Sequence, residues 1–440
     1  MKRFLCVTLA ILLTLALLAC GKEETVKEEA PAWAGQFAAG YGKVNVTPKY
    51  PVAMPGYRAT GEATRKSQGV LNELYITCVA ITDEIGNTVL LYTYDSVYID
   101  NATAPKLLKN ISEGTGIPED KIFVCVTHSH STPSHDSTYL DIASEAAIKA
   151  AQDAMADRAA TTVEYAAAQL EGMSFVRHYN TDTGIVVGSN FDPAGAGNKI
   201  SHTTEADKEL RLVRLSREGK QPILMANWLG HNSIASTGTT EYGLENRYFI
   251  SSDFVGFCRE YVEYNSDYLF AMYMGASGNI AVHSNLEGDP GHTTAVAYGA
   301  LLGEKVLATA ETMTAGQTGT ISTAATEFEG VTSNLTLNAI GAGSFGVITG
   351  PIEMFDTTSM AIREQSPYDV TFVLTLTNGA HWYVPTEICY DYIDCYEVRC
   401  GTNFRRGDAE RMVDIYVDLL NQTKNYRNKT GGQPPVLFFK

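Results

Sequence analysis

The sequence predicts one α/β domain in which helices pack on a mixed β-sheet. Strand-like and helix-like runs alternate along the chain, no internal repeat is evident, and no linker divides residues 40–440. The 38 glycines and 24 tyrosines favour a loop-rich mixed fold over a helical bundle, because helix interiors disfavour glycine. With 45% hydrophobic residues, the 440-residue chain can bury one large core or two modest ones.

Local patterns place the elements in order. The β-rich runs 74–82 and 88–94 flank a turn-type segment, DEIGN at 83–87, and this arrangement predicts a hairpin. The run KIFVCVT at 121–127 is almost entirely apolar, so we expect a strand at the centre of a sheet. Residues 139–156 carry apolar side chains at helical spacing. Further strands are expected at 162–168, 210–215, 223–228, 269–274, 320–328 and 370–376, and further helices at 104–112, 253–264, 294–313 and 409–421.

The N-terminus has the sequence pattern of an export signal. Two cations, Lys2 and Arg3, precede an apolar run that ends at Cys20, and the run is shorter than the ~20 residues a membrane-spanning helix needs. It resembles a bacterial lipoprotein signal. That resemblance implies a signal peptide at 1–19, a lipidated Cys20 and a flexible tether over 20–39, with the domain held on the extracytoplasmic side of the cell envelope by the lipid alone. An ordinary secretory signal or a short membrane anchor is the alternative.

Net charge and cysteine content exclude other classes. A formal charge of -17 has the wrong sign for a phosphate-binding surface, so nucleic-acid binding is not expected. Six cysteines after the signal are too few for a disulfide framework in a domain of this size. Cys78 and Cys125 lie in apolar strands and are expected to be buried thiols. One bridge among Cys389, Cys395 and Cys400 is possible, but its connectivity cannot be predicted.

Two histidine motifs follow predicted strands. His128 and His130 end the strand at 121–127, and residues two apart on an extended chain project to the same side. His231 follows the strand at 223–228. Ligands in α/β folds bind at the carboxyl ends of strands, so these side chains are candidates for a metal site. Solvated loop histidines are the alternative, since a His-x-His pair alone is a weak signal.

Seven segments resemble the neutral/alkaline, non-lysosomal ceramidase family. THSHSTP at 127–133 is similar to the family's T-H-T-H-S-G-P, and NWLGH at 227–231 is similar to its N-F-x-x-H. The other matches are GKVNVTP at 42–48 with MPGY at 54–57, ISSD at 250–253, PIEMF at 351–355, WYVPT at 382–386 and YE at 396–397. The resemblance covers the family's N-terminal catalytic domain, and we expect no C-terminal β-sandwich.

The resemblance implies one Zn²⁺ per chain. Carried over by position, its ligands would be His128, His231, Glu353 and Tyr383, a set of nitrogen and oxygen donors that suits zinc. His130 would orient the metal-bound water or transfer a proton. Without the resemblance, Glu353 would be a solvated carboxylate and Tyr383 an ordinary amphipathic side chain.

Two further residues take catalytic roles by the same match. Asp253 would bond either a ligand histidine or the helix that it precedes, and a purely structural N-cap is an equal alternative. Arg177 resembles the family's substrate-pocket arginine, with a surface salt bridge as the alternative.

The function implied is zinc-dependent hydrolysis of a linear amide, an N-acyl sphingoid or a related N-acyl lipid, by metal-activated water. One departure weakens this expectation: Ala281 stands where the family has a serine, and a methyl group can neither attack a carbonyl nor donate a hydrogen bond. The candidate substitutes for that serine are His283 and Ser284. A different small amide, such as a cell-wall fragment, is another possible substrate. The alternative function is a catalytically reduced, metal-binding lipoprotein that captures a ligand. Oligomeric state is not predicted.

Overall fold

The computed structural model describes residues 31–54, 66–134, 137–188, 194–237, 240–245, 248–284, 286, 289 and 294–429. The expected signal peptide at 1–19 and the lipidation site Cys20 lie outside the described residues. Within the described ranges, no helix has both the length and the apolar character needed to cross a membrane.

A large mixed sheet forms the centre of the molecule. Its strands, in order across the sheet, are β16 (Leu269–Met274), β12 (Ile223–Trp228), β11 (Glu209–Arg217), β6 (Ala159–Gln169), β1 (Ala38–Asn45), β3 (Tyr75–Thr82), β4 (Thr88–Tyr94) and β5 (Ile122–Val126), with β18 (Thr314–Ala315) beside β6. The pairs β4–β5 and β12–β16 are parallel, and the other neighbours are antiparallel. Each parallel pair is joined through a helix, as a parallel connection requires.

Helices cover one face of this sheet. The helices α2 (Ala104–Thr115) and α3 (Ser137–Ala156) lie over β3, β4 and β5, and α4 (Asp253–Tyr264) and α5 (Ala295–Ala310) lie over β11, β12 and β16. Two glycines in β1 allow α3 to approach closely. A Cβ at Gly40 or Gly42 would lie 1.9 or 2.1 Å from a backbone oxygen of the helix.

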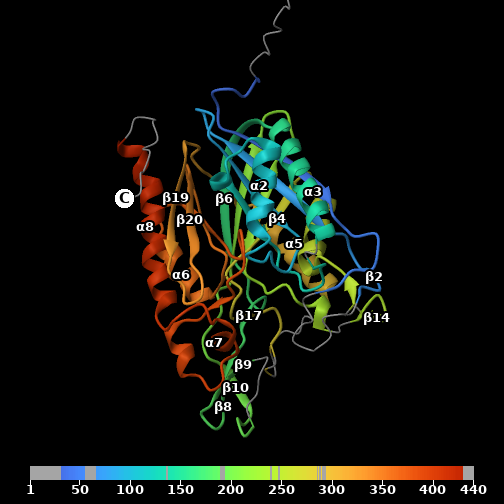
Figure 1. Ribbon diagram of the computed structural model, residues 1–440, viewed down its shortest axis with the longest axis vertical. Helices are drawn as coiled ribbons and strands as arrows, with labels where there is room; N and C mark the ends of the chain where they lie inside the picture. The colour runs from blue at the N-terminus through green and yellow to red at the C-terminus, as the bar shows by residue number, and fades with distance from the viewer. Residues whose placement is uncertain are drawn as a thin grey trace, which may run out of the picture.

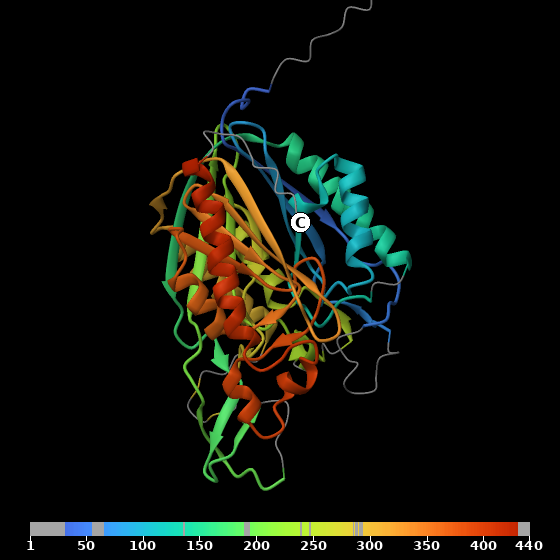
Figure 2. The same ribbon diagram turned by 60° about the vertical axis from the view of Figure 1, so that its left-hand side comes forward.

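A second sheet packs against the other face, which makes four layers in the order helix, sheet, sheet, helix. It contains β19 (Ile321–Phe328), β20 (Leu335–Ala342), β21 (Phe345–Thr349) and β23 (Val370–Leu374). Its inner side chains meet those of the large sheet in one apolar cluster. Its outer face is covered by α6 (Asp356–Glu364) and α8 (Asp408–Lys429), as Figure 2 shows for the red helix over the orange strands.

Short elements gather at one end of the sheets, at the bottom of Figure 1. They include β7 (Phe175–Val176) paired with β17 (Ile280–Ala281), β8 (His178–Thr181) with β9 (Val186–Gly188) and β10 (Lys199–His202), β22 (Glu353–Met354) with β24 (Tyr383–Val384), η4 (Glu387–Asp391) and α7 (Tyr396–Cys400). The remaining elements are β2 (Gly69–Val70) paired with β15 (Phe249–Ile250), β13 (Thr240–Glu241) paired with β14 (Leu244–Glu245), η2 (Glu119–Lys121) and η3 (Ala235–Thr237).

The predicted α/β class is confirmed, and two details of the prediction are wrong. The strand expected at a sheet centre, β5, is an edge strand; it is buried because residues 376–378 cover its open side, with the Asn378 amide donating to Ile122 O and accepting from Val124 N. The expected tether over 20–39 extends too far, because Phe37, Ala38 and Ala39 are buried in the fold.

All six described cysteines are free thiols. Cys78 and Cys125 are buried in the strands β3 and β5, as expected. The bridge that the sequence left open among Cys389, Cys395 and Cys400 is not formed in the structure.

Candidate metal centre

Curling of the large sheet brings the two histidine motifs together. The strands β5 and β12 are far apart in the strand order, but the Asn232 side chain donates to Thr127 O at 3.0 Å and His130 N donates to Asn232 O at 3.3 Å. The Tyr273 hydroxyl of β16 also donates to Leu91 O of β4 at 3.1 Å. The two strand ends therefore meet across the open side of the curled sheet.

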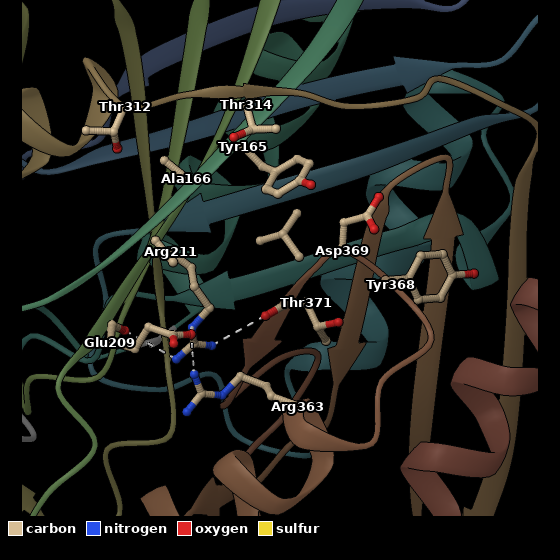
Figure 3. A pocket seen from close by; sticks show the side chains of 12 residues that line it. Tyr165, Ala166, Glu209, Arg211, Thr312, Thr314, Arg363, Tyr368, Asp369 and Thr371 are labelled. Carbon is tan, nitrogen blue, oxygen red and sulfur yellow. Dashed lines mark hydrogen bonds and ion pairs between the residues drawn. The ribbon is translucent and has the colours of Figure 1, made fainter.

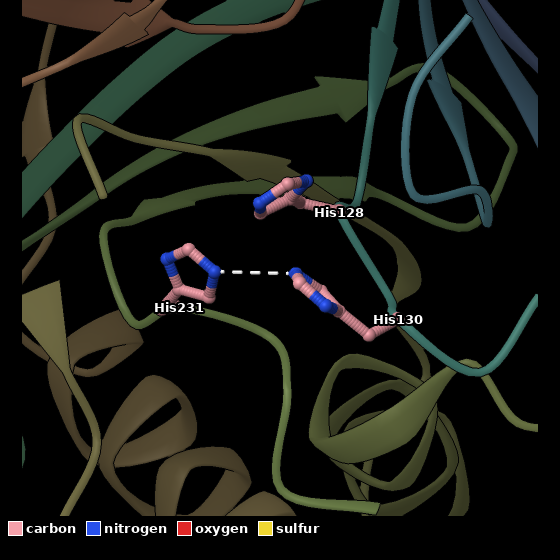
Figure 4. A group of neighbouring side chains, drawn as sticks. All are labelled: His128, His130 and His231. Carbon is pink, nitrogen blue, oxygen red and sulfur yellow. Dashed lines mark hydrogen bonds between the residues drawn. The ribbon is translucent and has the colours of Figure 1, made fainter. Parts of the chain in front are cut away.

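Three imidazoles converge at this point (Figure 4). The ring centroids of His128, His130 and His231 lie 4.6 to 5.2 Å apart, and one nitrogen from each ring lies within 4.8 Å of the others. His128 and His231 are buried and His130 is partly buried. Solvated loop histidines, the alternative left open by the sequence, do not fit this burial.

Backbone carbonyls fix the orientation of the two buried rings. His128 Nδ1 contacts Val97 O at 2.6 Å, and His231 Nδ1 contacts Ser277 O at 3.1 Å. A carbonyl can only accept, so each Nδ1 carries the proton and each Nε2 presents a lone pair to the centre. Burial lowers the pKa of His231 well below its usual value, the nearby Arg177 guanidinium acts in the same direction, and both favour the neutral ring. Metal-binding histidines have this arrangement.

Glu353 places a carboxylate oxygen next to His128. Its Oε2 lies 3.4 Å from His128 Nε2, and both atoms are buried without a hydrogen-bond partner. Bonds of ~2.0–2.1 Å in tetrahedral zinc coordination separate two ligand atoms by about 3.4 Å. Two orphaned polar atoms at this spacing fit a bound metal ion better than a hydrogen bond, so the residues present fit zinc.

Tyr383 lies beside Glu353, because β24 pairs with β22 in the register Glu353↔Tyr383. The tyrosine is buried, and burial together with the Glu353 charge raises the pKa of its phenol well above the usual value. The Arg177 guanidinium, 5.4 Å from the Tyr383 ring centroid, acts in the opposite direction. In the metal-free protein the phenol is therefore neutral.

His130 is the most exposed of the three histidines. Its Nε2 is 3.2 Å from His231 Nε2. The sequence resemblance gave it a role beside the metal, and the structure places one of its nitrogens within 4.8 Å of a nitrogen of each expected histidine ligand, His128 and His231.

Arg177 is not a surface residue: it is 5% exposed. Its Nε donates to Glu397 Oε1 at 2.7 Å and its Nη2 donates to Gly278 O at 2.7 Å. Glu397 also contacts His178, and these partners lower the pKa of the Glu397 carboxyl despite its burial. Sequence reasoning gave Glu397 and His178 no role, although the matched YE pair at 396–397 contains this glutamate.

Asp253 acts on the backbone rather than on a ligand side chain. Its carboxylate accepts from Phe254 N, at the start of α4, at 2.7 Å and from Ala235 N at 2.8 Å. It thereby ties the loop that follows His231 to the helix. Burial raises the pKa of Asp253 to about 7.

Ala281 lies in β17, opposite Phe175 of β7. The suggested substitute Ser284 is engaged elsewhere, since its Oγ lies 3.1 Å from His202 Nε2. No hydrogen bond of the described Ser284 points to the histidine centre.

Two cavities lie outside this centre. One, of about 350 Å³, is lined by Tyr165, Arg211, Arg363 and Tyr368 among others (Figure 3). Its two arginines are paired with Asp207 and Glu209, so their charge is already neutralised. The other, of about 680 Å³, is lined by Phe175 and His202 among others. Neither is lined by an expected zinc ligand.

Comparison with known proteins supports the fold. The structure is similar to the crystal structure of the neutral ceramidase from Pseudomonas aeruginosa, with a TM-score of 0.69 and 14% identity over 89% of this chain and 75% of that one. It is equally similar to a ceramidase complexed with C2, with a TM-score of 0.70 and 14% identity over 91% of this chain and 77% of that one. No protein-family model matches the sequence, and no curated protein matches it. At this identity the likeness shows that the chain has the ceramidase fold.

Proposed function

We propose that this protein is a zinc-dependent hydrolase that cleaves the amide bond of an N-acyl sphingoid or a related N-acyl lipid. The observation that carries the proposal is the buried, unpartnered pair of His128 Nε2 and Glu353 Oε2, 3.4 Å apart beside His231. The ceramidase fold of the chain supports the substrate class.

The ion would be held by His128, His231, Glu353 and Tyr383. When bound, zinc supplies a Lewis acid for the carbonyl and lowers the pKa of a water molecule to about 7. The Nδ1 contacts of the two histidines to Val97 O and Ser277 O keep their Nε2 atoms directed at the centre.

The other residues act on protons and positions. Amide hydrolysis must deliver a proton to the leaving amine, and His130 Nε2 is the partly buried atom able to hold that proton. Asp253 fixes the loop of His231 through Ala235 N. Arg177 is held by Glu397 and Gly278 O and keeps its guanidinium against the Tyr383 ring.

Ala281 favours a second candidate, a metal-binding protein that captures a ligand without cleaving it. Loss of one oxyanion donor typically costs about 2.7–4 kcal/mol of transition-state stabilisation. Rates would then fall by a factor on the order of 10²–10³ while the metal ligands stay intact.

Hydrolysis of a fluorogenic N-acyl sphingosine by the purified protein separates the two. We expect turnover that a chelator abolishes and zinc restores, and that is lost in His128→Ala but kept in the control His202→Ala. Stoichiometric zinc without turnover over a broad amide panel would support ligand capture, and a protein that binds no metal would reject both candidates.

We also propose that the chain is exported and acylated at Cys20, so that it is anchored at the membrane by lipid. The support is the basic and apolar N-terminal pattern that ends in this cysteine. The wild type should incorporate labelled palmitate and sediment with membranes. Cys20→Ser should do neither, and sedimentation unchanged by that substitution would reject the lipid anchor.

A further inference from the structure

A second group of ligand-type side chains lies behind Arg177. His178 begins β8, Cys395 immediately precedes α7, and Glu397 is in the first turn of α7. All three are buried, with 3%, 6% and 1% exposure, and their nitrogen, sulfur and oxygen atoms lie within 4.8 Å of one another. These residues come from distant parts of the sequence, so only the fold brings them together.

We propose that His178, Cys395 and Glu397 form a second metal site, which takes a zinc-type thiophilic divalent cation. Glu397 Oε2 lies 2.9 Å from His178 Nε2 and 3.2 Å from Cys395 Sγ. Tetrahedral zinc, with bonds of ~2.0–2.3 Å, separates its ligands by about 3.3–3.8 Å. The side chains therefore need to move apart by only a few tenths of an ångström to admit the ion.

The donor set selects the kind of ion. Mg²⁺ and Ca²⁺ prefer oxygen ligands alone, whereas an imidazole, a thiolate and a carboxylate together suit zinc. Cys389 lies next to this group, since it is buried in one apolar cluster with Cys395 and its thiol interacts with the Cys395 thiol; a movement of its side chain toward the ion would supply a fourth ligand. A closed set of four protein ligands is the pattern of a structural site rather than a catalytic one.

The surroundings match a closed site. The rings of Tyr392 and Phe355 lie 5.5 and 5.9 Å from the His178 ring and exclude water from it. Arg177 occupies Glu397 Oε1, which leaves Oε2 for the ion and holds the carboxylate in place.

Binding at this site has a defined proton balance and a structural consequence. The thiolate is the metal ligand, so the ion displaces the Cys395 thiol proton, and any proton on His178 Nε2, into solvent. The bound ion would link β8 to α7 and, through Glu397, fix Arg177 beside Tyr383. The site would thus stabilise the part of the chain that carries the candidate metal centre.

Cobalt substitution tests the proposal, because only this site contains sulfur. The purified full-length protein, stripped of metal, is titrated with Co²⁺ while the thiolate-to-cobalt charge-transfer absorption in the near ultraviolet is recorded. We expect a band that saturates at about one equivalent of thiolate-bound cobalt per chain, and zinc analysis should give two ions per chain. The double variant His128→Ala/His231→Ala should keep the charge-transfer band and lose one zinc.

Two cysteine variants complete the experiment. Cys395→Ser should abolish the charge-transfer band, whereas the control Cys400→Ser, at the other end of α7, should retain it. A wild-type protein without this band, or with a Cys389–Cys395 disulfide in its mass spectrum, would overturn the proposal and leave a hydrogen-bonded network only. The wild-type spectrum decides this even if Cys395→Ser does not fold.

Discussion

Replacing Glu353 by glutamine should destabilise the zinc-loaded protein and stabilise the metal-free one. In the metal-free state Glu353 Oε2 and His128 Nε2 are buried 3.4 Å apart with no hydrogen bond between them. Because His128 Nδ1 donates to Val97 O, its Nε2 is an acceptor that faces a second acceptor. A glutamine amide can donate to this nitrogen, so Glu353→Gln supplies the missing proton.

The magnitudes follow from the two orphaned atoms. Each buried polar group without a partner costs about 1–3 kcal/mol, so metal removal should expose a deficit of about 2–6 kcal/mol in the wild type. Restoring one hydrogen bond should recover about 1–3 kcal/mol in the metal-free variant. Zinc at 1,000 times its dissociation constant stabilises the folded state by about 4 kcal/mol, and a neutral amide ligand should retain little of this gain.

Urea unfolding with chelator and with zinc measures both effects. The order of unfolding free energies should invert: Glu353→Gln above wild type in chelator, and below it in zinc. The control Glu304→Gln, on the exposed face of α5, should follow the wild type in both conditions. A Glu353→Gln protein that is less stable than wild type in chelator would refute the assignment of these two atoms to a metal ion.

Three further outcomes are expected. Burial raises the pKa of Asp253 to about 7 in the folded state, against ~3.9 in the unfolded state, so between these pH values the folded protein holds a proton that the unfolded protein has lost. The free energy of unfolding should therefore fall by about 1.4 kcal/mol per pH unit as the pH rises from about 4 to 7. Asp253→Asn should remove this slope, and parallel pH profiles for the two proteins would contradict it. Metal analysis should show almost complete zinc loss for His231→Ala and partial loss for Tyr383→Phe; full occupancy of either would exclude that side chain as a ligand. Gly42→Ala should lower the free energy of unfolding by roughly 1–3 kcal/mol or more, because its Cβ would meet an α3 carbonyl oxygen at 2.1 Å. The control Gly188→Ala, whose Cβ would have contacts no closer than 3.9 Å, should leave the free energy of unfolding unchanged. Equal unfolding midpoints for the two variants would refute the close packing of α3.

Much of the fold could be predicted from local pattern, because most long strands and helices carry clear periodicity. The strands β1, β20 and β21 were missed, and all three contain glycine, which weakens a strand pattern. The stacking of two sheets could not be predicted, since periodicity shows that a face is buried but not what covers it. The strand β5 demonstrates this: its apolar run predicted burial correctly, but residues 376–378, far along the chain, provide the cover rather than another strand of the sheet.

The candidate site, too, could be predicted from local pattern only in part. Position at strand ends was enough to select His128 and His231, whereas Glu353 and Tyr383 lie in two-residue strands that have no period and were reached only through family resemblance. The carbonyls that orient the histidines could not be foreseen, because every residue has one.

The backbone at the site also departs from the conformations that its residues prefer. His128 and Trp382, the latter next to Tyr383, have φ values of 59° and 64°, and such values cost of order 1–3 kcal/mol each in a non-glycine residue. Such strain persists only where the surrounding structure enforces it, so rules of local propensity fail here because tertiary contacts set the backbone of the candidate metal centre.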